Sequence, residues 1–333
     1  MKFFLFIALF SLLLHLYGCQ NATDNQTTVS TPTPPAPMPV AHQVNGIAKP
    51  DSVIPPLKEK NTSTPTNPST TIPAASSHFY QWLDEYPKEL ALSRQISTPS
   101  GYQRISLDQN SFGTWLRGLP LLPKSSKVML YNGNTKAYQA GAHRVLNIDI
   151  GKRDLQQCAD AVMRLKAEYH YSQQDYEAIH FNYTSGHTIR FSDWSKGKKP
   201  KIKGNKVSFS SPSGSVNSSY ANFKKYLTNV YSYAGTASLS KELRSKPVKD
   251  IMPGDVFIWG GFPGHAILVM DVAKHPKTGK KIFLVAQSYM PAQSIHILKN
   301  LNDQSLSPWY SEDFGEQLNT PEWTFDRNSL KQF

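Results

Sequence analysis

Hydrophobic and polar positions divide the chain into three parts. An almost unbroken apolar run covers residues 3–14, and residues 21–77 consist mainly of Thr, Pro, Ser, Asn and Ala without periodic apolar positions. From residue 78 onwards, apolar residues recur at the spacings of helices and strands. The pattern predicts a leader over 1–18, a polar linker over 19–77, and a single folded domain over 78–333. About 255 residues is near the upper limit for one hydrophobic core.

The periodicities within the domain predict two helices and three consecutive strands. Helical spacing of apolar side chains covers about 155–170 and about 220–231, and strand-like runs cover 254–259, 265–272 and 281–287. Short segments rich in Gly and Pro separate the strands, so we expect the strands to pair as antiparallel neighbours. The predicted fold class is α+β, with the first helix packed on an antiparallel sheet.

The leader resembles the signal peptide of a bacterial lipoprotein. Lys2 precedes the apolar run, which is too short to span a bilayer but long enough for the core of a signal peptide. Residues 16–19, Leu-Tyr-Gly-Cys, resemble a lipobox, which implies cleavage before Cys19 and a lipid on its thiol. Gln20 at the next position implies, by enterobacterial sorting rules, the periplasmic side of the outer membrane in a Gram-negative host. The alternative is an ordinary secretory signal with an incidental cysteine.

The linker over 19–77 is expected to act as a spacer. Its composition cannot bury enough apolar surface to offset the entropy of ordering the chain. Its many prolines favour extended conformations. We therefore expect it to hold the domain away from the membrane and to have no other function.

The net charge of +12 is concentrated in the folded domain. Residues before position 79 carry +1, so about +11 belongs to the domain. A basic cytoplasmic domain would suggest nucleic acid, but an exported one meets phospholipid, lipopolysaccharide and wall polymers instead. The densest basic run, Lys196 to Lys206, is either a solvated loop or a contact for such a surface. We expect the partners to be the membrane, through Cys19, and peptidoglycan or another anionic envelope polymer, with no nucleic acid.

Cys158 is the only other cysteine in the chain. A lone thiol in an oxidising compartment is either buried and inert or retained for its chemistry. Asp154 is a suitable helix N-cap, with Gln157 three residues later as in a capping box, so Cys158 falls in the first helical turn. Unpaired N–H groups and the helix dipole favour a thiolate there. The alternative is that Cys158 belongs to the apolar stripe of this helix and lies in the core.

The second half of the domain suggests a partner for this thiol. A Gly-Asp turn at 254–255 leads into a strand, a glycine-rich loop follows, and His265 opens the next strand. This order, after a helix that begins near a cysteine, resembles the papain-like cysteine hydrolases of bacterial cell walls, of the CHAP and NlpC types. The resemblance implies that Cys158 is the nucleophile, His265 the base, and Gln287 the polar third residue on the following strand.

A longer resemblance covers most of the domain. The strings LQQCADAVMRL, GDVFIWGGFPGHAILVMDVA and AQSYMPAQ are similar to those of an uncharacterised family of bacterial lipoproteins, a domain of unknown function. Because no activity is attached to that family, this second resemblance implies little about chemistry.

Hairpin geometry also places a polar group near His265. A turn centred near residues 276 and 277 puts Gln287 or Ser288 opposite His265, because directly paired residues share one face of a sheet. A glutamine carbonyl in that position could orient the imidazole, as the third member of a triad does. Gln156 and Gln157 lie near the thiol as candidate oxyanion donors, but one of them is expected to cap the helix.

Two functions from different classes remain open. The first is a cysteine hydrolase that cleaves an amide bond, with peptidoglycan as the expected substrate and Cys158, His265 and Gln287 in the roles given above. The second is a non-catalytic lipoprotein that binds an envelope partner and keeps Cys158 in its core. The sequence has no metal-ligand spacing, no HExxH motif and no phosphate-binding glycine motif, so we expect no metal and no cofactor.

Overall fold

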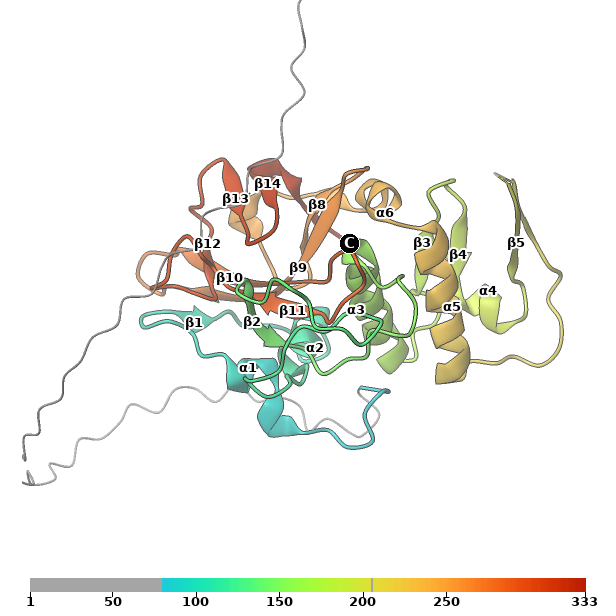
Figure 1. The fold of residues 1–333 in the computed structure, drawn as a ribbon, viewed down its shortest axis with the longest axis horizontal. Helices are drawn as coiled ribbons and strands as arrows, with labels where there is room; N and C mark the ends of the chain where they lie inside the picture. The colour runs from blue at the N-terminus through green and yellow to red at the C-terminus, as the bar shows by residue number, and fades with distance from the viewer. Residues whose placement is uncertain (1–79, 205) are drawn as a thin grey trace, which may run out of the picture. The chain divides into compact units, whose positions relative to one another are not determined.

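The structure, a computed structural model, describes residues 80–204 and 206–333 (Figure 1). The predicted signal peptide, Cys19 and the linker lie outside these residues. Within them, helices are combined with sheets whose strand pairings are all antiparallel, as the predicted fold class requires. None of the helices in these two ranges is long and apolar enough to cross a membrane.

Six α-helices lie in the described part of the chain: α1 (Leu92–Gln95), α2 (Phe112–Gly118), α3 (Cys158–Ser172), α4 (Phe191–Ser195), α5 (Tyr220–Tyr233) and α6 (Thr236–Glu242). The strands of the same part are β1 (Gln103–Arg104), β2 (Ala142–Val145), β3 (His180–Asn182), β4 (Thr188–Arg190), β5 (Pro200–Lys203), β6 (Lys206–Phe209), β7 (Arg244–Ser245), β8 (Val256–Trp259), β9 (His265–Lys274), β10 (Lys281–Gln287), β11 (His296–Leu298), β12 (Tyr310–Ser311), β13 (Gln317–Asn319), β14 (Thr324–Asp326) and β15 (Leu330–Gln332).

The main sheet has the strand order β2-β11-β10-β9-β8-β15-β7, with β1 also pairing β9 and β12 also pairing β10. Strand β9 is apolar on both faces because both faces are covered. Ala266, Leu268 and Met270 belong to a core shared with α2 and α3, whereas Ile267 and Val269 belong to a second core shared with β13 and β14. This double burial explains the nearly continuous apolar run in the sequence.

The predicted elements form close to their predicted positions. Helix α3 begins three residues later than expected, because the carboxylate of Asp154 instead accepts hydrogen bonds from the Ala292 N–H (2.7 Å) and the Gln157 side chain. Helix α5 and strands β8 to β10 match their predicted ranges within two residues. The β9–β10 hairpin pairs Lys274 with Lys281 and shifts register near Leu284, so its register differs from the predicted one.

The Gly-Asp turn before β8 has a structural explanation. Gly254 has a φ of +98°, and a Cβ there would lie 2.8 Å from the Phe112 ring. Asp255 accepts hydrogen bonds from the backbone N–H of Met252 (2.7 Å) and from Lys246 (3.0 Å). The two residues therefore form the entry into β8.

A buried ion cluster fixes β9 to its neighbours. Asp271 is fully buried and accepts from the Nε atoms of Arg104 (2.6 Å) and Arg117 (2.7 Å). The two arginines lie on β1 and α2 respectively, so one carboxylate joins three elements. The two cations offset the cost of burying the Asp271 carboxylate.

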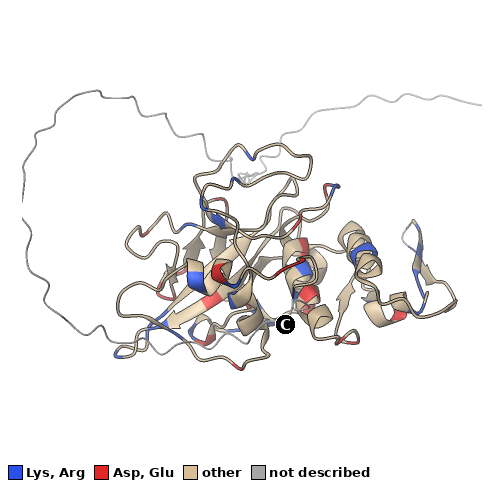
Figure 2. Cartoon of the chain, turned by 90° about the horizontal axis from the view of Figure 1, so that it is seen from below, with Lys and Arg blue, Asp and Glu red and all other residues tan. Residues whose placement is uncertain are grey.

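The lysine-rich segment is partly a hairpin rather than a loop. Strands β5 and β6 pair antiparallel, and Lys203 faces Lys206 at the turn. Ile202 and Val207 pack against the core, whereas Lys201, Lys203 and Lys206 alternate with them and are exposed. Figure 2 shows the basic residues of this hairpin along its strands.

Candidate functional site

Cys158 is the first residue of α3 and is only 8% exposed. Its sulfur faces the backbone N–H groups of Cys158 itself, Ala159 and Ala266. Burial and the Asp160 carboxylate outweigh these donors and raise the pKa of the thiol to about 11. The resting group at neutral pH is therefore the thiol, and the thiolate expected from the helix dipole is not its resting form.

His265 is the first residue of β9 and is 1% exposed. Its Nε2 lies 2.9 Å from the side-chain oxygen of Gln287, the last residue of β10. Burial is the main cause that lowers the pKa of His265 to about 4; the bond to Gln287 opposes it, and the positive charge of Lys136 adds to it. The imidazole is therefore neutral at physiological pH.

The hydrogen bond defines the tautomer of this neutral ring. The Gln287 oxygen can only accept, so Nε2 of His265 carries the proton and donates it. Nδ1 is then the unprotonated nitrogen, which is the atom that could accept a proton from a thiol.

Ser288, the other predicted partner of His265, is engaged elsewhere. Its hydroxyl lies within hydrogen-bond distance of the backbone oxygens of Gln156 (2.9 Å) and Gln293 (3.0 Å) and donates to one of them. The structure therefore brings Gln287 and not Ser288 to His265.

The start of β9 lies beside Cys158, and the polar contact is with the backbone of this strand and not with the His265 side chain. The sulfur faces the N–H of Ala266, the residue that follows His265. No hydrogen bond joins the sulfur to the imidazole among the contacts of the described residues. Ala266 packs on the side of α3, whereas the His265 ring packs on Phe325 of the second core, at a ring distance of 5.8 Å.

A family comparison assigns the chain without assigning a function. The model of a domain of unknown function, DUF4846, matches residues 92–332. The chain belongs to this family. No curated protein and no solved structure matches the chain.

Several side chains around His265 in this DUF4846 domain were not predicted from the sequence. Tyr289 lies 4.7 Å and Trp323 lies 5.4 Å from the His265 ring, centroid to centroid. Glu322 accepts from the side chain of Gln287 (2.6 Å) and from Lys136 (2.5 Å). Tyr289 lies two residues after Gln287, so the predicted hairpin could have placed it near His265. Glu322 and Trp323 lie in the turn between β13 and β14, and no local sequence pattern connects that turn with His265.

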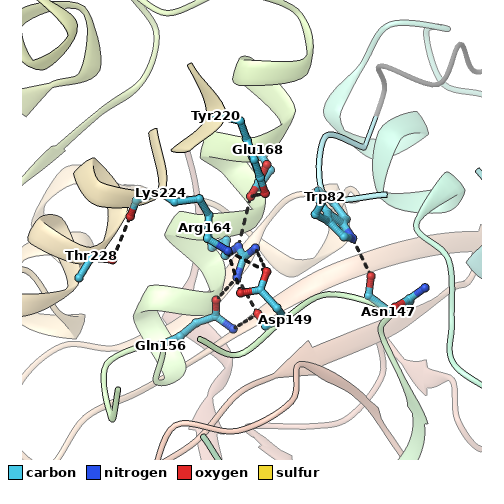
Figure 3. A network of polar contacts seen from close by, with 9 residues as sticks. All are labelled: Trp82, Asn147, Asp149, Gln156, Arg164, Glu168, Tyr220, Lys224 and Thr228. Atoms are coloured by element: carbon cyan, nitrogen blue, oxygen red, sulfur yellow. Dashed lines mark hydrogen bonds and ion pairs between the residues drawn. The ribbon is translucent and has the colours of Figure 1, made fainter. Parts of the chain in front are cut away.

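Neither glutamine before Cys158 is available as an oxyanion donor. The Gln156 side chain accepts from Arg164 (2.6 Å) and donates to the backbone oxygen of Asp149 (3.4 Å), within the polar network drawn in Figure 3. The Gln157 side chain donates to Asp154 (3.0 Å). In the DUF4846 domain, the donors that face the Cys158 sulfur are backbone N–H groups, those of Cys158, Ala159 and Ala266.

The glycine before His265 is required by packing. A Cβ on Gly264 would lie 2.5 Å from the backbone oxygen of Gly261 and 2.8 Å from that of Trp259. The loop also carries Phe262, which is 95% exposed, and Met290 is half exposed on the loop that follows Gln287. Exposed apolar side chains thus lie on both loops next to the DUF4846 site.

The described part of the DUF4846 domain has no group of three His, Cys, Asp or Glu side chains positioned to hold a metal ion. Neither Cys158 nor His265 lines any of four cavities found in that part of the chain, and both side chains are buried. The thiol and the imidazole therefore lie beneath the surface in the state described.

Proposed function

We propose that this chain is a cysteine hydrolase with a papain-like site that cleaves an amide bond of the cell envelope, with peptidoglycan as its substrate. The observation that supports this most strongly is the 2.9 Å hydrogen bond between His265 and Gln287, made by the residue that precedes Ala266, whose backbone N–H faces the Cys158 sulfur. A neutral imidazole held by an acceptor on one nitrogen is the arrangement that a general base needs.

In the proposed reaction, the Cys158 sulfur attacks the carbonyl carbon of the amide. Nδ1 of His265 takes the thiol proton and passes it to the leaving amine as the C–N bond breaks. Water then attacks the thioester, the acid is released, and the proton returns to the sulfur. The resting thiol and neutral imidazole match this sequence, because His265 removes the proton during the attack and no thiolate has to exist beforehand.

The proposal requires the site to open. Cys158 is 8% exposed, and substrate needs access to its sulfur. The loops that carry Phe262 and Met290 flank His265 and Gln287, so their displacement would expose the site and bring apolar side chains to the substrate. Catalytic contacts are commonly longer in unliganded enzymes and shorten when substrate binds.

The test is digestion of purified peptidoglycan by the full chain, with released fragments and new amino groups measured by mass spectrometry. We expect Cys158→Ala and His265→Ala each to abolish release, and the double variant to be no worse than either, because the two groups act as one unit. Gln287→Ala should cost less. His187→Ala, in the loop between β3 and β4, is the control and should retain activity. Unchanged release in Cys158→Ala would refute the proposal.

A second candidate, a non-catalytic binding protein, is favoured by the burial of the thiol and its pKa of about 11. Its binding surface would be the outward face of the β5–β6 hairpin. Among the described residues, Lys201, Lys203 and Lys206 on this face have no ion pair, so their charges are available to an anion. Opposed like charges destabilise a hairpin unless an anion neutralises them. Binding to a wall polymer rich in phosphate should then weaken with salt and be lost when the three lysines become Gln. Salt-independent binding would contradict this candidate.

We also propose that the chain is anchored through Cys19, which rests on the sequence alone. Metabolic labelling with a radioactive fatty acid should label the wild type and not Cys19→Ser. Equal labelling of both would contradict the anchor.

A further inference from the structure

We propose that Glu322 is a positioning residue for this site: it sets the orientation of the Gln287 amide and thereby the tautomer of His265. The catalytic consequence rests on the proposed function, but the orientation and the tautomer do not. Glu322 lies in the turn between β13 and β14, 57 residues after His265 in the sequence, and it has no direct hydrogen bond to that ring among the described contacts.

The contacts of Glu322 allow only one of the two orientations of the Gln287 side-chain amide. One carboxylate oxygen, Oε2, accepts from Nε2 of Gln287 at 2.6 Å and from Nζ of Lys136 at 2.5 Å. The ammonium group can only donate, and the ionised carboxylate can only accept. If the Gln287 amide were reversed, its carbonyl oxygen would face the carboxylate without any proton between them. Gln287 is 1% exposed, so bulk water could not relieve that contact.

The orientation of the amide determines where the imidazole carries its proton. With the amide as observed, Oε1 faces Nε2 of His265 at 2.9 Å, and the neutral ring must be protonated at Nε2. A reversed amide would present N–H to the same nitrogen and would favour the ring protonated at Nδ1. That form has no free Nδ1 lone pair and could not accept the thiol proton in the proposed reaction. In a serine triad, the wrong histidine tautomer costs about 10⁴-fold in kcat.

The test reads the tautomer directly by NMR of full-length protein labelled with ¹⁵N-histidine. The signals of His265 are identified by their loss in His265→Asn. We expect the wild type to show Nε2 protonated and Nδ1 unprotonated at pH 7. In Glu322→Gln, the amide introduced at 322 can donate as well as accept, so both orientations of Gln287 become possible, and a population protonated at Nδ1 should appear. Glu316→Gln, an exposed glutamate just before β13, is the matched control and should match the wild type.

An exchange of the two groups should restore the tautomer. In the double variant Gln287→Glu with Glu322→Gln, the carboxylate at 287 can only accept, and so it again requires a proton on Nε2 of His265. The amide at 322 can still donate to that carboxylate and accept from Lys136. A role of Glu322 in stability alone would not predict that this exchange returns the ring to the wild-type tautomer.

The outcomes separate this proposal from the proposed function. A wild-type ring protonated at Nδ1, or a Glu322→Gln protein with the same tautomer as the wild type, overturns the positioning role, whether or not the chain hydrolyses anything. If the single variant does not fold, the exchange variant is the test, and a ring protonated at Nδ1 in that variant overturns the positioning role. If hydrolysis is found, Glu322→Gln should lower kcat by at least about tenfold with little change in KM, and the exchange should recover part of it. If the wild type and the variants show the predicted tautomers but the wild type hydrolyses nothing, the positioning role is supported and the proposed hydrolase function is refuted.

Discussion

Alkylation of Cys158 in the native protein should be slow at neutral pH and should accelerate up to about pH 11. Burial and Asp160 raise the pKa of this thiol from 9.0 to about 11. Only the thiolate reacts, and two pKa units reduce its fraction at pH 7 about 100-fold. The more basic thiolate is about tenfold more nucleophilic, with a Brønsted coefficient of about 0.4–0.5. The net expectation is a rate about tenfold below that of an unperturbed thiol, before the restricted access to a buried sulfur is included.

The assay follows the modification of Cys158 by iodoacetamide with mass spectrometry in a Cys19→Ser background, where Cys158 is the only thiol. The same chain unfolded in denaturant provides the reference rate at each pH. Asp160→Asn should move the rise in rate to lower pH, because it removes the second cause of the raised pKa. Asp175→Asn, an exposed position beyond the end of α3, should leave the profile unchanged.

A particular result would refute this reasoning. If the native thiol reacts at pH 7 as fast as the denatured chain, and its rate is already constant above that pH, then Cys158 is a thiolate. In that case the N–H groups at the start of α3 stabilise the thiolate more than burial and Asp160 destabilise it. A rate that stays low even at pH 11 and rises only on unfolding would instead indicate that access alone limits the reaction.

Three further predictions concern stability. Asp271→Asn should lower the free energy of unfolding by about 3–5 kcal/mol in urea titrations, because it leaves the buried Arg117 and the largely buried Arg104 without their carboxylate, while Asp313→Asn on the surface should change it little. Burial lowers the pKa of His265 to about 4 and that of His296 to about 3. As the pH falls below 6.5, these residues therefore bind protons in the unfolded chain before they do so in the folded chain, and the free energy of unfolding decreases. At about 1.36 kcal/mol per pKa unit, His265 should lower the free energy of unfolding by about 3 kcal/mol between pH 6.5 and pH 4. A free energy of unfolding that stays constant over this pH range would contradict the prediction. Gly264→Ala should cost about 1–3 kcal/mol, because its Cβ would meet a backbone oxygen at 2.5 Å, and an unchanged urea midpoint would disprove this.

Local patterns were sufficient to predict the elements that carry the candidate site. The apolar runs of β8, β9 and β10 and the spacing of α3 and α5 predicted their ranges within a few residues. These elements depend on nearest neighbours in the sequence and on a simple division between buried and exposed positions. The contact of His265 with Gln287 was also predicted, because one short hairpin connects them, although the observed register of that hairpin differs from the predicted one.

The sequence by itself thus determined where the cysteine, the histidine and the glutamine lie on their elements. Only the tertiary structure decided their chemical state. The helix dipole favours a thiolate at Cys158, but desolvation by packing from remote segments outweighs it and leaves a thiol. Glu322 reaches Gln287 from a hairpin 35 residues later, and Lys136 reaches Glu322 from a loop 186 residues earlier. Such contacts and the burial they impose depend on how distant segments pack, which no local pattern of residues encodes.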